Sequence, residues 1–296
     1  MLERRTDLAL EAHELWRERV RDGETPGVRT ETHAASGYEV TVVEVADAAA
    51  GRALGKPPGR YATLDLRPFW THGEDALPRA AAAVGAELRG LLARPIRSAL
   101  VVGLGNDAMT PDAVGPQVCA HVLVTRHLMR EAAFASLAAV SVLVPGVLGR
   151  TGMEAAETIR SAVRTVRPDV LIAVDALASR SLGRLCTTVQ LSDTGIVPGS
   201  GVGNRRCALN RRTLGLPVIA VGVPTVVDAA TLACDLLAEA GLPPPAAERL
   251  RGPDAGVMVT PRDIDAQLRA LARVVGYGID LALQPLSFRE LCDLMG

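Results

Sequence analysis

The sequence has little lysine and few aromatic residues, and neither sign of charge dominates. Lys56 is its single lysine, aromatic residues make up 3%, and 32 basic residues face 33 acidic ones, for a formal net charge of −1. Such a chain has no overall positive field to concentrate nucleic acid or an anionic membrane surface. The preference for arginine over lysine indicates coding bias rather than function.

Cysteine pairs and long apolar runs are also missing. The cysteines are odd in number and have no C-x-x-C spacing, which argues against a disulfide framework and a zinc ribbon: Cys119, Cys186, Cys207, Cys234 and Cys292. The start of the chain, MLERRTD, is charged and has no apolar signal core, and no segment is long and apolar enough to span a bilayer. We therefore expect a protein that stays in a reducing cytoplasm.

What is abundant is aliphatic sequence, since 48% of the residues are hydrophobic. From residue 97 onward, apolar segments typical of buried strands alternate with helical patterns around 113–130 and 152–166 and from about 225. The strand-like segments are 98–105, 140–146, 169–177, 187–193 and 217–224. This alternation predicts an α/β fold with a mostly parallel central sheet flanked by helices.

The first third of the chain has a different pattern. An amphipathic helix is predicted over residues 8–20, with Thr6 or Asp7 as its N-cap, and a second helix over 78–94. Strands are predicted over 38–45 and 59–66, as a hairpin or as neighbours. We expect an additional, smaller antiparallel or mixed β region here. Residues 8–95 would form the edge of a single domain whose α/β core spans 96–296.

Residues 101–116, VVGLGNDAMTPDAVGP, resemble the start of a nucleotide-binding loop. However, Pro111 disfavours an unbroken helix from residue 105, and the chain has no Walker A motif. Thr110 is expected to cap the next helix, Pro111 to be its first residue, and Asp112 to lie in its first turn. A carboxylate at that point takes the place of a phosphate, which disfavours nucleotide binding.

Two carboxylates are predicted to meet beyond the carboxyl ends of the parallel strands: Asp112 after the first central strand and Asp175 after the third. Such a pair supports acid and base catalysis, or grips a divalent metal together with a third ligand that the sequence does not make evident. A structural interpretation stays open for each residue. Asp112 would be an acid at the start of a helix, and Asp175 would be the N-cap of a helix that begins near Ala176. No serine elbow or cysteine–histidine pattern is present, and His121 and His127 do not share a helix face well.

Several segments together resemble the germination protease family of endospore-forming bacteria. They are collinear from RRTDLALE to MVTPRDID: 101–116, 123–127, 145–159, 168–181, 190–206 and 215–233. The resemblance implies an atypical aspartic endopeptidase that degrades small acid-soluble spore proteins at germination. It also implies a core similar to hydrogenase maturation proteases. Carried over by motif, the two catalytic aspartates are Asp112 and Asp175.

The same resemblance implies a zymogen that trims itself within Thr6-Asp7-Leu8-Ala9-Leu10-Glu11, between Asp7 and Leu8. Residues 1–7 would be the leader and 8–296 the peptidase domain. A homotetramer without cofactor or metal is implied, located in the forespore or spore core, with spore proteins as substrates and no direct contact with nucleic acid or membrane. Residues 240–256 would be a shortened form of a longer insertion in other members.

Further polar residues in the matched motifs are candidates for the crevice: Asn106, Glu154, Asp193 and Asp228. For the three acids, a structural cap or a crevice-shaping role is favoured over direct chemistry. Two alternatives to the spore protease remain. One is a metal-sensing maturation endopeptidase of the hydrogenase type, and the other is a non-catalytic binding protein.

Overall fold

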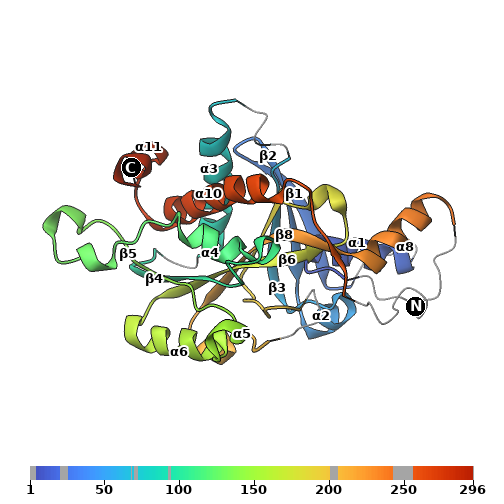
Figure 1. Ribbon diagram of the computed structural model, residues 1–296, viewed down its shortest axis with the longest axis horizontal. Helices are drawn as coiled ribbons and strands as arrows, with labels where there is room; N and C mark the ends of the chain where they lie inside the picture. Colours follow the sequence, from blue (N-terminus) through green and yellow to red (C-terminus); the bar gives the residue numbers. More distant parts are fainter. Residues whose placement is uncertain are drawn as a thin grey trace.

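The structure is a computed structural model that describes residues 5–20, 26–67, 69, 73–92, 95–200, 206–242 and 256–295. One mixed sheet passes through the molecule, with helices on both of its faces (Figure 1). The strand order is β1-β2-β3-β7-β8-β6-β4-β5, and a short β9 pairs with β8. The α/β class predicted from the sequence is confirmed.

The parallel part of the sheet contains four strands. They are β5 (Ala139–Leu143), β4 (Ser98–Gly103), β6 (Val170–Ser179) and β8 (Val218–Asp228), and each is parallel to the next. Every residue of β8 is buried, as is nearly every residue of β6, which explains their continuous apolar sequences. These strands lie where the alternating pattern predicted them.

The antiparallel part continues the same sheet. It contains β1 (Val28–Ala35), β2 (Tyr38–Val45), β3 (Gly59–Asp65) and β7 (Thr188–Ser192), and β7 joins it to β8. The predicted pairing of residues 38–45 with 59–66 is confirmed. Strand β1 escaped prediction because it is largely exposed and lacks an apolar alternation.

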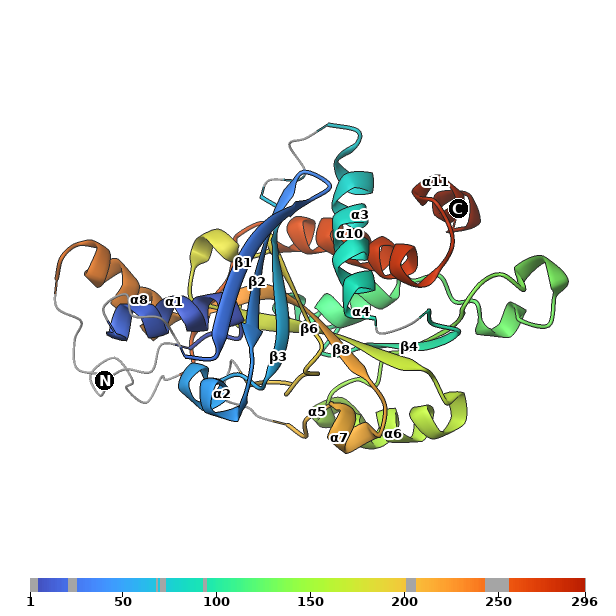
Figure 2. The same cartoon turned by 180° about the vertical axis from the view of Figure 1, so that it is seen from behind.

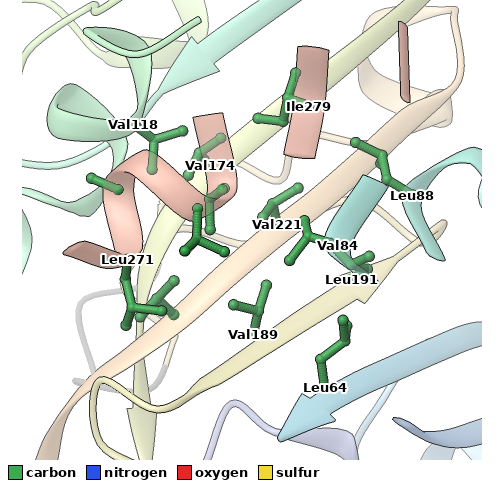
Figure 3. Packing of buried hydrophobic residues seen from close by; sticks show 14 of the residues in the cluster. Leu64, Val84, Leu88, Val118, Val174, Val189, Leu191, Val221, Leu271 and Ile279 are labelled. Atoms are coloured by element: carbon green, nitrogen blue, oxygen red, sulfur yellow. The ribbon is translucent and has the colours of Figure 1, made fainter. Parts of the chain in front are cut away.

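Three helices cover one face of the sheet, which we call the closed face. They are α3 (Ala76–Leu91), α4 (Val114–Cys119) and α10 (Ile264–Leu283), and Figure 2 shows them together on one side. Their apolar side chains form one cluster with side chains from several strands of the sheet, as Figure 3 shows for Leu64 of β3, Val174 of β6 and Leu271 of α10. The closed face therefore contains the main core.

The opposite face is covered at two separate places. Helices α1 (Ala9–Val20) and α2 (Ala48–Leu54) pack on β2 and β3, while α6 (Ala155–Val166) packs on β4 and β6 beside the short helices α5 (Leu148–Thr151) and α7 (Arg211–Leu214) (Figure 2). Each place has its own small apolar cluster. We call this the open face, because the candidate site lies between the two clusters.

Two predicted helix boundaries are wrong. The helix expected over 113–130 ends at Cys119, and 3₁₀ turns follow at Arg126–Leu128 and Ala132–Phe134. Here the backbone N–H of Leu123 donates to the carboxylate of Asp280 on α10 at 3.0 and 3.1 Å, a partner that a local pattern cannot reveal.

The helix expected from about 225 begins later, because β8 continues to Asp228 before α8 (Ala229–Glu239) starts. The last helix is α11 (Phe288–Met295). None of the helices in the described ranges has the length and apolar character needed to cross a membrane.

Candidate active site

Asp175 lies within strand β6 rather than at its end, so the predicted strand end and the helix start at Ala176 are both wrong. Strand β6 continues to Ser179 because β8 extends alongside it and pairs with it as far as Val227. The neighbouring strand β4 stops at Gly103, opposite Val174. Asp175 therefore still lies just past the carboxyl end of a parallel strand, as the topological argument required.

Asp112 is positioned by a tight loop after β4. The backbone N–H of Asn106 donates to the Asp112 carboxylate at 2.9 Å and to its carbonyl oxygen at 3.0 Å. Gly105 has φ +108°, and a Cβ there would lie 1.9 Å from the Asp112 carbonyl oxygen, so only glycine fits. The Thr225 hydroxyl donates to the carbonyl oxygen of Pro111 at 2.6 Å and holds the loop from β8.

The structure around Asp112 differs from the predicted helix start in one respect. Thr110–Asp112 form a separate 3₁₀ turn, and α4 begins only at Val114. Thr110 is part of that turn and makes no side-chain cap to α4, so its predicted role as N-cap is wrong. What the loop binds through its backbone is the carboxylate of its own Asp112.

A cleft of about 570 Å³ opens over the open face, and Asp7, Asp112 and Asp175 all line it. Asn106 and Glu154 line it as well, at the start of the loop and at the N-terminus of α6. The prediction that Asp112 and Asp175 share a crevice is thus confirmed by the geometry.

The other two candidate crevice residues have structural partners. Asp193 accepts a hydrogen bond from the backbone N–H of Arg60 at 2.8 Å, between β7 and β3. Asp228 is the N-cap of α8 and accepts from the backbone N–H and the hydroxyl of Thr231 at 2.9 and 3.0 Å. Both match the structural interpretation of these acids.

The two carboxyl groups of the cleft differ in burial, and this difference separates their pKa values. Asp175 is 6% exposed, and its pKa is raised well above the ordinary value, first by burial and then by the charges of Asp112 and Asp7. Burial raises the pKa of Asp112 as well. Each carboxylate accepts one backbone N–H that opposes the rise, from Asn106 at Asp112 and from Ala176 at Asp175, so the deeper burial of Asp175 makes the difference. Of the two, Asp175 therefore holds its proton more strongly.

Asp7 occupies the free edge of β6 beyond the end of β4. Its backbone N–H donates to the carbonyl oxygen of Ala178 at 2.9 Å, and its carboxylate accepts from the N–H of Ala178 at 2.9 Å and from the hydroxyl of Ser200 at 2.8 Å. The Asp7 side chain is therefore directed to β6 and the loop after β7. The prediction that it caps α1 is wrong.

The peptide group that joins Asp7 to Leu8 is held from two sides. The Asp7 carbonyl oxygen accepts from Lys56 Nζ at 2.7 Å and from Gln190 Nε2 at 3.3 Å. Gln190 Oε1 in turn accepts from the backbone N–H of Ala9 at 2.7 Å, and the N–H of Leu8 donates to Thr6 Oγ1 at 3.0 Å. Sequence reasoning missed both Lys56 and Gln190, although the single lysine was a visible signal.

Glu11 anchors the segment on the far side of this peptide group. It has no solvent exposure and accepts from the Ser179 hydroxyl at 2.8 Å, the N–H groups of Arg180 and Ser181 at 2.6 and 3.1 Å, and the guanidinium of Arg184 at 3.0 Å. The hydroxyl of Thr6 donates to it as well. Residues 6–11 are thus held near both ends, by Asp7 on β6 and by Glu11 on the residues that follow this strand.

A metal-binding cluster would need at least three ligand side chains close together. Within the described ranges, no group of three or more histidine, cysteine, aspartate or glutamate side chains could hold a metal ion. His121 lies near the ring of Tyr277, with 6.4 Å between the ring centroids, and His127 is exposed. Neither histidine lines the cleft.

Residues 9–239 match the model of the Peptidase_A25 family, described as "Germination protease". The chain belongs to the germination protease family. It is 41% identical to the germination protease of Caldanaerobacter subterraneus subsp. tengcongensis, with 98% of each chain covered, and 41% identical to that of Clostridium perfringens, with 95% of each covered. The germination protease of Bacillus cereus is 43% identical over 79% of this chain and 65% of its own. Membership indicates a peptidase with a role in spore germination.

A hydrogenase maturation protease, HycI from Thermococcus kodakarensis, is a structural neighbour at 16% identity. It covers 66% of this chain and 99% of its own, with a TM-score of 0.37. A likeness of that size carries no argument about the chemistry of this germination protease.

Proposed function

We propose that this germination protease is a self-processing aspartic endopeptidase that cuts its own Asp7–Leu8 bond and, once trimmed, cuts small acid-soluble spore proteins. One observation carries the proposal. Asp7 lies in the same cleft as Asp112 and Asp175, and its backbone is bonded to the strand that bears Asp175. The chain would thus place its own Asp7–Leu8 bond within reach of Asp112 and Asp175.

The different burial of the two carboxyl groups suggests their roles. Asp112, which is less buried than Asp175, would take a proton from water as the water oxygen attacks the Asp7 carbonyl carbon. Asp175, whose pKa burial raises, would hold a proton and give it to the departing nitrogen of Leu8. Because the acid must be protonated, the rate of trimming should fall as the pH rises through the pKa of Asp175 in the folded chain.

The test follows the chain and a substrate in one reaction. Freshly made full-length protein is incubated at mildly acidic pH with a small acid-soluble spore protein, and both are followed by mass spectrometry. We expect loss of residues 1–7 and discrete fragments of the substrate. Asp112→Asn and Asp175→Asn should abolish both events, since Asn has a similar shape but cannot transfer the proton.

Two results would argue against the proposal. If the leader and the substrate both stay intact, the proposal as a whole is refuted. Trimming by Asp175→Asn at the rate of the unchanged chain would remove Asp175 from the chemistry and leave the protease activity to be explained by other groups.

A further inference from the structure

The end of helix α2 brings the single lysine of the chain to the peptide group that joins Asp7 to Leu8. Gly55 ends α2 in the left-handed conformation, with φ 70° and ψ 23°, and Pro57 and Pro58 follow Lys56. The N–H of Lys56 donates to the Gly51 carbonyl oxygen at 3.0 Å, so its backbone is tied to the helix that precedes it. The partly buried side chain reaches back over residues 6 and 7, where Nζ contacts the carbonyl oxygens of Thr6 at 3.3 Å and Asp7 at 2.7 Å.

Gln190 reaches the same carbonyl oxygen from the sheet. It pairs with Gly222 of β8, and Gly222 pairs with Asp175 of β6, so these three residues form one row across the sheet. Residues in one row point to the same face, which places the side chains of Gln190 and Asp175 on the open face. Gln190 is 8% exposed, and its amide is oriented by the hydrogen bond from Ala9.

We propose that Lys56 and Gln190 are catalytic residues that stabilise the oxyanion formed on the Asp7 carbonyl during self-trimming. The inference rests on the proposed cleavage after Asp7. Two N–H donors, one of them charged, already meet the oxygen on which negative charge develops, and such donors lower the barrier most in a water-poor site. The two carboxyl groups supply the proton transfers, and the lysine and the glutamine receive the charge.

The step balances with water as the only co-reactant. The water oxygen bonds to the Asp7 carbonyl carbon, one water proton passes to a carboxylate, and the C=O electron pair moves to the oxygen held by Lys56 and Gln190. That pair then returns, the C–N bond breaks, and the nitrogen of Leu8 takes a proton from a carboxyl group. The products are the α-carboxyl group of Asp7 and a free amine on Leu8.

The experiment measures the rate of loss of residues 1–7 after a short pulse of cell-free synthesis, with intact-mass detection. Lys56→Met should slow trimming about 100-fold or more, the usual effect of losing one oxyanion donor. Lys56→Arg keeps a charged donor and should fall between Lys56→Met and the unchanged chain. The matched control is Arg52→Met, which removes an exposed cation from α2, just before Lys56, and should leave the rate unchanged.

Gln190→Glu tests the second donor. The glutamate can still accept the hydrogen bond from the N–H of Ala9, but a carboxylate cannot donate to the Asp7 carbonyl oxygen. We expect trimming to slow about tenfold or more. A rate within threefold of the unchanged chain would remove Gln190 from the proposal.

Chemical rescue distinguishes a donor from a merely structural lysine. In Lys56→Ala, ethylammonium should restore trimming in a saturable way, whereas tetramethylammonium, which has no N–H, should not. This result decides the question even if Lys56→Met folds poorly. Trimming by Lys56→Met within threefold of the unchanged chain, or absence of rescue in a folded Lys56→Ala, would overturn the role of Lys56.

The outcomes also separate this inference from the proposed function. If the unchanged chain never loses residues 1–7, the proposed self-cleavage fails. If the unchanged chain trims, Asp175→Asn does not, and Lys56→Met trims at full rate, only the inference about Lys56 fails.

Discussion

The closed face and the open face of the sheet are built differently. On the closed face, α3, α4 and α10 share one apolar cluster with strands from both parts of the sheet. On the open face, two smaller clusters lie apart, and polar groups from β6, β7 and the N-terminal segment form hydrogen bonds in the region between them. The comparison predicts that mutations on the closed face affect mainly the stability of the fold, and mutations on the open face mainly the proposed activity.

The largest effect should follow from a cavity in the closed face. Leu271 on α10 is fully buried, and Leu271→Ala should lower the free energy of unfolding by about 2–5 kcal/mol, as is typical of buried leucines. Urea unfolding measures this. Leu182→Ala, which truncates a leucine that is 47% exposed, serves as the control and should cost less than about 0.5 kcal/mol. Slower trimming by folded Leu271→Ala would contradict the prediction that the closed face affects stability and not activity.

A second effect concerns a buried acid on the closed face. Burial raises the pKa of Asp280 to about 7, so the folded chain keeps this proton where the unfolded chain has lost it. Stability should therefore fall as the pH rises from about 4 to about 7, by roughly 4 kcal/mol at most. Asp280→Asn should remove this part of the pH dependence in urea unfolding, whereas Asp265→Asn, on an exposed residue of the same helix, should not. Equal slopes for all three chains would contradict the assignment.

A mutation on the open face should change the rate of self-trimming. Gly105→Ala places a methyl group against the carbonyl oxygen of Asp112 and should displace that residue, slowing trimming about 100-fold. Gly149→Ala is the matched control, because Gly149 also lines the cleft and a Cβ there meets nothing within 4 Å. Intact-mass kinetics compare the two. Unchanged trimming by Gly105→Ala would show that the position of Asp112 is not critical.

The smallest effect is expected at the rim of the cleft. Arg206 and Glu154 form an ion pair at 3.2 Å, with exposed fractions of 38% and 39%. Exposed pairs contribute little, so Arg206→Gln should change the free energy of unfolding by less than about 1 kcal/mol. A loss of several kcal/mol would mean that the rim, too, stabilises the fold.

Local sequence determined much of the architecture. Aliphatic runs fixed the buried strands of the parallel part, because a strand covered on both faces must be apolar throughout. The same runs made Asp112 and Asp175 conspicuous, since carboxyl groups next to buried strands need a reason to be there. These features depend on neighbours in the chain, so a pattern can reveal them. The Asp7–Leu8 bond, by contrast, was implied only by the resemblance of residues 6–11 to a family motif.

Tertiary structure decided the rest. Asp175 lies inside β6 because β8 is long enough to pair with β6 beyond this residue. Helix α4 ends at Cys119, and the Asp280 carboxylate on α10 accepts a hydrogen bond from the backbone that follows it. Lys56 and Gln190 are 134 residues apart in the sequence, and only the sheet order and the end of α2 bring both to one carbonyl oxygen. Hydrogen bonds between distant segments leave no period in the sequence. The sequence therefore identified the two carboxyl groups, and the fold identified the two side chains that contact the Asp7 carbonyl oxygen.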